Sequence, residues 1–120
     1  MHELSVCQAL LRQVAQLVQS RGASVVESIT VEVGPLCGIE PMLLANAFWI
    51  MRAGSCAAQA ALFIEETSVT VGCVSCGAQS QTAPNRLTCA ACGGFRTRIV
   101  AGDELRLRRV ELRAPEPVTV

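Results

Sequence analysis

The sequence contains no lysine and no tyrosine, and it has one histidine, one tryptophan and three phenylalanines among its 120 residues. With so few aromatic side chains, a hydrophobic core has to be built mainly from Ala, Val and Leu. No aromatic platform is available for stacking the bases of a single-stranded nucleic acid. A hydrolytic metal centre usually needs a second histidine, which this sequence lacks, and no nucleophile–base pair is recognisable in it. The composition therefore argues against a hydrolase, and we expect a protein that is not an enzyme.

The sequence also lacks net charge and any long hydrophobic run. Residues 1–72 hold three arginines and six acids, residues 73–101 hold three arginines and no acid, and residues 102–120 hold four of each. A neutral chain lacks the basic footprint that neutralises phosphates. No apolar run reaches the ~18–20 residues that span a bilayer, and Met1-His2-Glu3 is not the basic start of a signal peptide. We therefore expect a cytoplasmic protein that binds neither nucleic acid nor membrane.

The periodicity of the apolar residues predicts an α+β fold. The expected elements are a helix over 4–19, a strand over 25–33, a helix over 41–54, strands over 60–66 and 68–72, and a last strand near 105–112. In that last strand the alternation slips at Arg108-Arg109, as it does at a β-bulge. The fold class we predict is two helices packed on a small mixed β-sheet, with an inserted zinc-ribbon-like domain that carries four cysteines.

The second predicted helix is apolar along most of its length. Pro41 suits a first helical position, and Glu40 just before it favours the positive end of the helix dipole. We expect Gly54 to lie just beyond its end. Its predicted core stripe consists of Leu44, Phe48 and Met51, broadened by Leu43, Ala47 and Ile50.

Four of the seven cysteines form two matched pairs, Cys73-Val-Ser-Cys76-Gly77 and Cys89-Ala-Ala-Cys92-Gly93, separated by twelve residues between Cys76 and Cys89. A two-residue spacer lets both sulfurs of a tight turn face one ion, and the following glycine permits the positive φ that closes the turn. Four thiolates satisfy the tetrahedral preference of Zn²⁺ and leave no position for a substrate. A disulfide, a redox pair and iron–sulfur ligation are the alternatives. In a reducing compartment the matched pairs favour structural zinc. Cys7 lies on the apolar stripe of the first helix and is expected to be a buried, inert thiol.

The one histidine is residue 2 of the chain. The backbone amine of Met1, the His2 amide nitrogen and the His2 imidazole can close two fused chelate rings on one metal ion, and Glu3 adds an amide nitrogen or a carboxylate. Nitrogen-rich donors of this kind suit Ni²⁺ and Cu²⁺. The alternative is chance, because chain termini tolerate almost any residue.

These features occur together in one order. Met1-His2-Glu3-Leu4-Ser5 opens a helix, Gly34 and Pro41-x-x-Leu44-x-x-Ala47-Phe48 follow, and the two Cys-x-x-Cys pairs come last, over about 112 residues. In this combination the sequence resembles the HypA/HybF family of nickel metallochaperones. The resemblance implies a carrier that binds Ni²⁺ at its N-terminus and delivers it during maturation of [NiFe]-hydrogenase. It implies the GTPase HypB and the hydrogenase large subunit as partners.

The resemblance also implies which residues hold the nickel. His2 would be the main ligand, with backbone nitrogens of Met1, His2 and Glu3 nearby, and Glu40 would stand close to the site without being a principal ligand. This chain has no second histidine. The donor that completes the nickel coordination is therefore left open among Glu3, Glu40, water and a residue of a partner.

The expected domains follow from the same resemblance. A nickel-binding α+β domain would comprise residues 1–72 and 102–113, a zinc-binding domain residues 73–101, and a frayed tail residues 114–120. We expect a monomer or a weak homodimer. The alternative function is a zinc-ribbon adaptor that docks proteins or nucleic acid. Its best support is the group Arg106, Arg108, Arg109 and Arg113, although interleaved acids favour an ordinary solvated strand.

Overall fold

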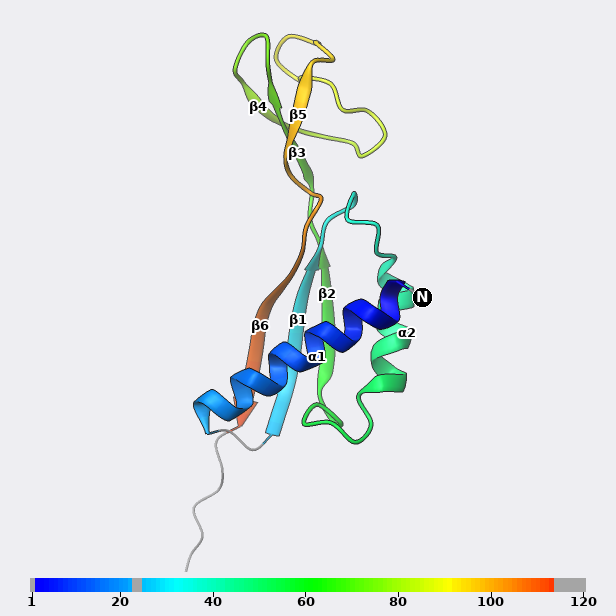
Figure 1. Cartoon of the computed structure of the whole chain (residues 1–120). Helices are drawn as coiled ribbons and strands as arrows, with labels where there is room; N and C mark the ends of the chain where they lie inside the picture. Colours follow the sequence, from blue (N-terminus) through cyan, green and yellow to red (C-terminus); the bar gives the residue numbers. More distant parts are fainter. Residues whose placement is uncertain (1, 23–24, 114–120) are drawn as a thin grey trace, which may run out of the picture. The chain divides into compact units, whose positions relative to one another are not determined.

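The structure, a computed structural model, describes residues 2–22 and 25–113, and the predicted frayed tail lies outside the described residues. Its elements are α1 (His2–Arg21), β1 (Val25–Val33), α2 (Pro41–Met51), β2 (Ala61–Glu66), β3 (Val69–Cys73), β4 (Gln79–Thr82), β5 (Thr97–Ala101) and β6 (Leu105–Arg113) (Figure 1). The predicted α+β class, with two helices, small sheets and an inserted four-cysteine region, is confirmed. Over the described ranges, no helix combines the length and hydrophobicity needed to cross a bilayer.

The strands form two three-stranded sheets, with the orders β2-β1-β6 and β4-β3-β5. Figure 1 shows β1 and β2 running in the same direction and β6 running opposite to both, so the first sheet is mixed. Helix α2 connects the parallel pair β1 and β2, because parallel neighbours need a crossover rather than a hairpin. In the second sheet β3 pairs antiparallel with both neighbours, and the pairing with β5 shifts register between Thr70 and Val71.

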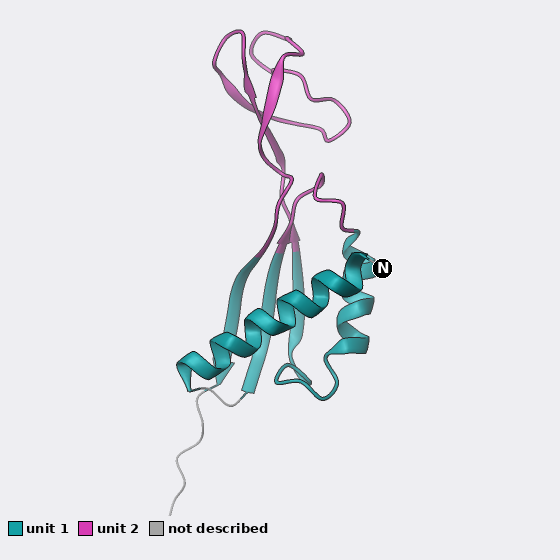
Figure 2. Ribbon diagram, in the orientation of Figure 1, with its two compact units in different colours: residues 1–31, 40–64, 107–120 teal, residues 32–39, 65–106 magenta. Residues whose placement is uncertain are grey.

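The chain divides into two compact units (Figure 2). The first, which we call the helical unit, comprises residues 1–31, 40–64 and 107–120; the second, the cysteine unit, comprises residues 32–39 and 65–106. The three segments of the helical unit show that the chain leaves this unit and returns to it twice. The predicted division into a nickel-binding domain, 1–72 with 102–113, and a zinc-binding domain, 73–101, stays a prediction.

Helix α1 begins earlier than predicted, at His2, and ends at Arg21. Glu3 in its first turn and Arg21 in its last turn both complement the helix dipole. Gly22 then takes φ 63°, a left-handed conformation that ends helices at little cost in glycine. The helix therefore presents His2 and Glu3 from its first turn.

Helix α2 starts as predicted but ends at Met51, before the predicted end at 54. The Glu40 side chain accepts a hydrogen bond from the Leu43 N–H at 3.0 Å and so caps the first turn. The predicted core stripe is partly wrong, because Leu43 and Ile50 are 51% and 73% exposed. The side chains that are buried are Leu44, Ala47 and Phe48. A helix that is apolar on every side has no periodicity that could select its buried face.

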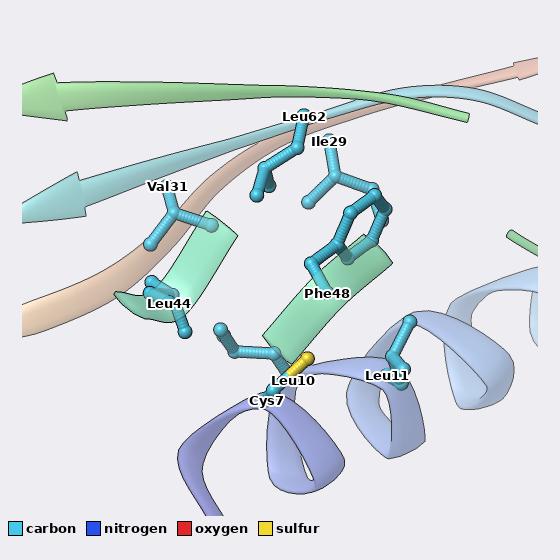
Figure 3. Close-up of a pocket in the computed structure, with 8 residues that line it drawn as sticks. All are labelled: Cys7, Leu10, Leu11, Ile29, Val31, Leu44, Phe48 and Leu62. Carbon is cyan, nitrogen blue, oxygen red and sulfur yellow. The ribbon is translucent and has the colours of Figure 1, made fainter. Parts of the chain in front are cut away.

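Both helices pack on one face of the sheet β2-β1-β6, and Figure 3 shows the side chains that meet there. A small cavity of about 10 Å³ remains between them, lined by Cys7, Leu10, Leu11, Ile29, Val31, Leu44, Phe48 and Leu62. The lining has no charged group, and the volume is no larger than one water needs. It is packed interior rather than a substrate pocket. Cys7 is buried there as predicted, and burial raises the pKa of its thiol.

Residues 28–31, the middle of strand β1, are buried on both faces of the strand. Ile29 and Val31 face the helices, but Ser28 and Thr30, which point to the opposite face, are each only 7% exposed. The cause is the central position of β1 between β2 and β6. In β6 the alternation of exposure slips at Arg108 and Arg109, where two successive side chains are exposed, as the sequence predicted for a bulge.

Two adjacent leucines of α2 provide a test of this packing. Leu44 is 1% exposed, whereas Leu43 is 51% exposed. We expect Leu44→Ala to lower the free energy of unfolding by about 3 kcal/mol, because it removes buried methyl groups and leaves a cavity. Leu43→Ala, the matched control, is expected to change it by less than about 0.5 kcal/mol. Urea unfolding at low protein concentration measures both, and equal losses would contradict the assigned helix face.

Candidate metal centres

The fold brings the four paired cysteines together. The sulfur atoms of Cys73, Cys76, Cys89 and Cys92 all lie within 4.8 Å of one another. The Cys73–Cys92 and Cys76–Cys89 sulfur pairs are each 3.6 Å apart. A tetrahedral zinc site with bonds of about 2.3 Å separates its sulfurs by about 3.8 Å. The donor set and its spacing therefore fit one tetrahedral metal ion such as Zn²⁺.

The two cysteine pairs have the same local geometry. In the first, the Cys76 N–H points to the Cys73 sulfur at 3.4 Å, and the Gly77 N–H donates to the Cys73 carbonyl at 3.0 Å. In the second, the Cys92 and Gly93 N–H groups make the corresponding contacts with Cys89, at 3.5 and 2.8 Å. The backbone thus holds each pair of sulfurs on the same side of its turn.

The glycines after the pairs make these turns accessible. Gly77 and Gly93 have φ values of 76° and 74°, a region that other L-residues enter only at a cost. The sequence argument from Cys-x-x-Cys-Gly therefore describes the observed backbone. The other cysteines, Cys7, Cys37 and Cys56, are not part of the cluster.

Hydrogen bonds divide the four thiols of the cluster into two kinds. The Cys76 N–H holds the pKa of Cys73 down at about 6, and the Cys92 N–H lowers the pKa of Cys89. An N–H from Ala78 lowers the pKa of Cys76, but its hydrogen bonds with the Cys89 and Cys73 sulfurs outweigh this and raise it to about 11. Cys73 and Cys89 therefore favour the thiolate, which is the form that binds metal, whereas the raised pKa values of Cys76 and Cys92 favour the thiol.

The segment around the cluster has almost no core of its own. Within residues 73–101 only Cys73 and Cys89 are buried, and large apolar side chains such as Val74 and Phe95 are 68% and 83% exposed. An apolar interior cannot hold this segment in place. A bound metal ion would supply the missing cross-link between its two halves.

The predicted nickel residues lie at the start of α1. His2 is exposed there, and Met1 lies outside the described residues. The Glu3 carboxylate accepts a hydrogen bond from the Glu40 backbone N–H at 3.4 Å, and the Glu40 carboxylate caps α2 through Leu43. Hydrogen bonds from the backbone N–H groups of Glu3 and Glu40 lower the pKa of the Glu3 carboxyl group.

These contacts join the first turns of α1 and α2. Glu3 and Glu40 are 37 residues apart in sequence, so only the folded chain reveals their contact. The structure brings Glu40 to the end of α1 that carries His2. Both carboxylates accept hydrogen bonds from backbone N–H groups at the start of α2, Glu3 from Glu40 and Glu40 from Leu43. Among residues 2–22 and 25–113, the four cysteines are the one group of three or more potential metal ligands that the structure brings together, so nickel binding at His2 and Glu3 stays a prediction.

The arginines of β6 do not form a free basic patch. Arg106 pairs with Glu32 at 3.0 Å and Arg113 with Glu27 at 2.9 Å. Arg109 lies 3.6 Å from Glu111 in the same strand. In each pair a glutamate neutralises the arginine charge that would otherwise attract a phosphate. These contacts give no support to nucleic-acid docking on this strand.

Comparison with known proteins gives a consistent result. A family model described as "Hydrogenase/urease nickel incorporation, metallochaperone, hypA" matches residues 1–112. The hydrogenase maturation factor HypA of Nitrosospira multiformis is 43% identical over 93% of this chain and 97% of that protein. The HypA of Aquifex aeolicus is 33% identical over the same shares.

Solved structures are similar over the whole chain as well. The solution structure of the Ni metallochaperone HypA from Helicobacter pylori has a TM-score of 0.71 and 25% identity, and covers 94% of this chain and 98% of that one. A second HypA solution structure has a TM-score of 0.74 and 27% identity, with 96% and 98% covered. With its four-cysteine cluster, its helix beginning at His2 and these matches over nearly its full length, the chain belongs to the HypA family of nickel metallochaperones, which are maturation factors and not enzymes.

Proposed function

We propose that this protein binds one Ni²⁺ at its N-terminus and delivers it for the maturation of [NiFe]-hydrogenase. The observation that carries the proposal is the exposed start of α1, where His2 is followed by Glu3 and Glu3 is hydrogen-bonded to Glu40. The family supplies the general role in nickel incorporation. A surface site with few protein donors suits a carrier, because the ion has to be released again.

In this proposal the nickel is cargo and the ligands come from the first residues of the chain. His2 would contribute its imidazole, Met1 its backbone amine, and Glu3 an amide nitrogen or its carboxylate, the donors that Ni²⁺ favours. Glu40 would act on Glu3 rather than on the ion, since its N–H holds the Glu3 carboxylate and its own carboxylate caps α2.

The cluster of Cys73, Cys76, Cys89 and Cys92 would hold one structural Zn²⁺. The fit of the four sulfurs to a tetrahedral ion supports this assignment. When bound, zinc supplies a cross-link and no open coordination position. The partners we propose are the GTPase HypB and the hydrogenase large subunit, and the compartment we propose is the cytoplasm.

A nickel titration by calorimetry tests the proposed site. Zinc-loaded protein with its native N-terminus is expected to bind about one Ni²⁺, whereas His2→Ala and a version with two residues added before Met1 should bind about 100-fold more weakly or not at all. The added residues leave the imidazole in place but move the amine out of the chelate. Equal binding by all three proteins would place nickel elsewhere and contradict the proposal.

Delivery needs a separate measurement. Nickel-loaded protein is mixed with purified hydrogenase large-subunit precursor, with and without HypB and GTP, and nickel in the precursor is counted. We expect transfer from the native protein and none from His2→Ala beyond the level of free nickel. A native protein that binds nickel but transfers none would restrict the function to storage.

A further inference from the structure

The outer face of α2 is apolar and exposed. Its large side chains Met42, Leu43, Trp49 and Ile50 are 70%, 51%, 65% and 73% exposed, while the helix packs Leu44, Ala47 and Phe48 inward. Isolated exposed apolar residues need no explanation, but a contiguous patch on one helix does. No function described above uses this face.

The spacing of the patch is symmetric about one polar residue. Asn46 is exposed at its centre, with Met42 and Leu43 four and three positions before it and Ile50 and Trp49 four and three positions after it. Residues three and four positions apart share a helix face, so these five side chains form one stripe over the 11 residues of α2. If the helix direction is reversed about Asn46, Met42 takes the position of Ile50 and Leu43 takes that of Trp49, so each apolar residue falls on another.

We propose that two copies of this chain associate through this face of α2, antiparallel and related by a twofold axis that passes beside Asn46. Met42 and Leu43 of each copy then pack against Trp49 and Ile50 of the other. The two Asn46 amides meet at the axis, where each can donate and accept one hydrogen bond. A twofold interface requires this kind of self-complementary surface.

The charges at the ends of α2 favour the antiparallel arrangement. Glu40 precedes the helix, and Arg52 follows it. A parallel pair would bring the two Glu40 carboxylates together and align the two helix dipoles, which repel each other. An antiparallel pair places the acidic end of one helix at the basic end of the other. The two Glu3–Glu40 contacts then lie at opposite ends of the pair, so the proposed nickel residues stay accessible.

The area of the patch matches a small homodimer. The four large side chains together expose roughly 500 Å², taking about 200 Å² for a fully exposed large residue. A standard interface buries about 800 Å² per partner, of which about 65% is apolar in homodimers, or about 500 Å². The face is therefore large enough for the apolar centre of such an interface and too small for an obligate one.

Trp49 is held in place before any partner arrives. The Arg52 guanidinium stacks over its ring at 3.8 Å from the centroid, and the same Arg52 donates from Nη1 to the Ala60 carbonyl at 2.8 Å. A preorganised tryptophan loses little side-chain entropy on binding and is typical of the residues that dominate interface energies. The fixed position of Trp49 supports its role as the anchor of this contact.

Because Trp49 is the only tryptophan and there is no tyrosine, intrinsic fluorescence reports on this face. We expect sedimentation velocity of the full zinc-loaded chain to show a monomer–dimer equilibrium with a Kd of about 1–100 µM. The Trp49 emission should shift to the blue with the same concentration dependence. Monomer at every concentration overturns the proposal. So does an emission shift that appears only when the hydrogenase large subunit is added, since that assigns the face to a different partner.

Matched variants locate the contact. Ile50→Arg should weaken association about 100-fold or more, because it places a charge in an apolar contact. Phe63→Arg, the control, alters an apolar residue of β2 that is 55% exposed and should leave Kd within about threefold. Far-UV circular dichroism checks the folding of both. If Phe63→Arg weakens association as much as Ile50→Arg, the α2 face is not the interface.

A charge pair tests the twofold axis itself. Asn46→Asp and Asn46→Arg alone each place like charges opposite one another, and each should weaken association at least about tenfold. An equimolar mixture of the two variants should associate about tenfold more tightly than either alone, because only then do opposite charges meet. A mixture no tighter than its components overturns the arrangement about Asn46.

Discussion

Removal of zinc is expected to unfold residues 73–101 while α1 and β1 keep their structure. Only Cys73 and Cys89 are buried in that segment, so no apolar core remains when the metal is taken away. Structural zinc in small cysteine-bound domains carries an apparent binding free energy of about 10–16 kcal/mol at neutral pH. The helical unit has its own core, which includes Val14, Val26 and Leu44.

Amide hydrogen exchange of zinc-loaded and chelator-treated protein measures this difference. We expect protection to disappear across 73–101 and to persist for Val26, Ile29 and Val31. Cys76→Ser should reproduce the effect without a chelator, because three thiolates bind zinc more weakly than four. Cys37→Ser is the control, since Cys37 lies outside the cluster. Protection that survives in the metal-free protein would show that the segment folds without zinc.

Replacement of Gly34 by alanine is expected to destabilise the protein by about 3 kcal/mol or more, because two backbone segments meet there without room for a side chain. A Cβ at Gly34 would overlap the carbonyl group of Gly102. The Gly34 N–H donates to the Glu104 carbonyl, and the Leu36 N–H donates to the Gly102 carbonyl, each at 2.8 Å. Neither backbone can move away without breaking these hydrogen bonds.

Gly38→Ala provides the comparison. Gly38 has φ 81°, and a Cβ there meets nothing within 4 Å, so alanine should cost only the left-handed backbone penalty of about 1–2 kcal/mol. Both glycines lie in the cysteine unit, and both variants are compared with the parent in their zinc-loaded forms by urea unfolding. A Gly38→Ala loss as large as that of Gly34→Ala would contradict the close-approach explanation.

The cysteine pairs were predictable because their geometry is local. A spacing of two residues followed by glycine determines how one backbone turn presents two sulfurs, and Gly77 and Gly93 adopt the positive φ that this argument requires. The start of α2 was predictable for a similar reason, since capping and dipole preferences act within one turn. The contact between Glu3 and Glu40 was not predictable from spacing, because it joins residues 37 positions apart.

The buried face of α2 shows where periodicity has no information. The residues of α2 are apolar on every side of the helix, so the sequence pattern fitted several buried faces equally well. The prediction that Leu43 and Ile50 belong to the core was therefore wrong. Packing against Ile29 and Leu62 selects Leu44 and Phe48 instead. The apolar side chains that remain outside form the surface from which we infer the dimer.

The sequence alone determined two turns that bring four cysteines together as a candidate metal site, and six elements of predictable type and approximate position. The helix and strand periods and the cysteine spacings are properties of neighbouring residues, so they can be read without the fold. Tertiary structure alone decided that β1 lies between β2 and β6, that Gly34 and Gly102 meet, and which face of α2 is exposed. These features depend on contacts between residues that are distant in sequence. The free energies of such contacts compete across the whole chain, so the contacts leave no pattern among neighbouring residues.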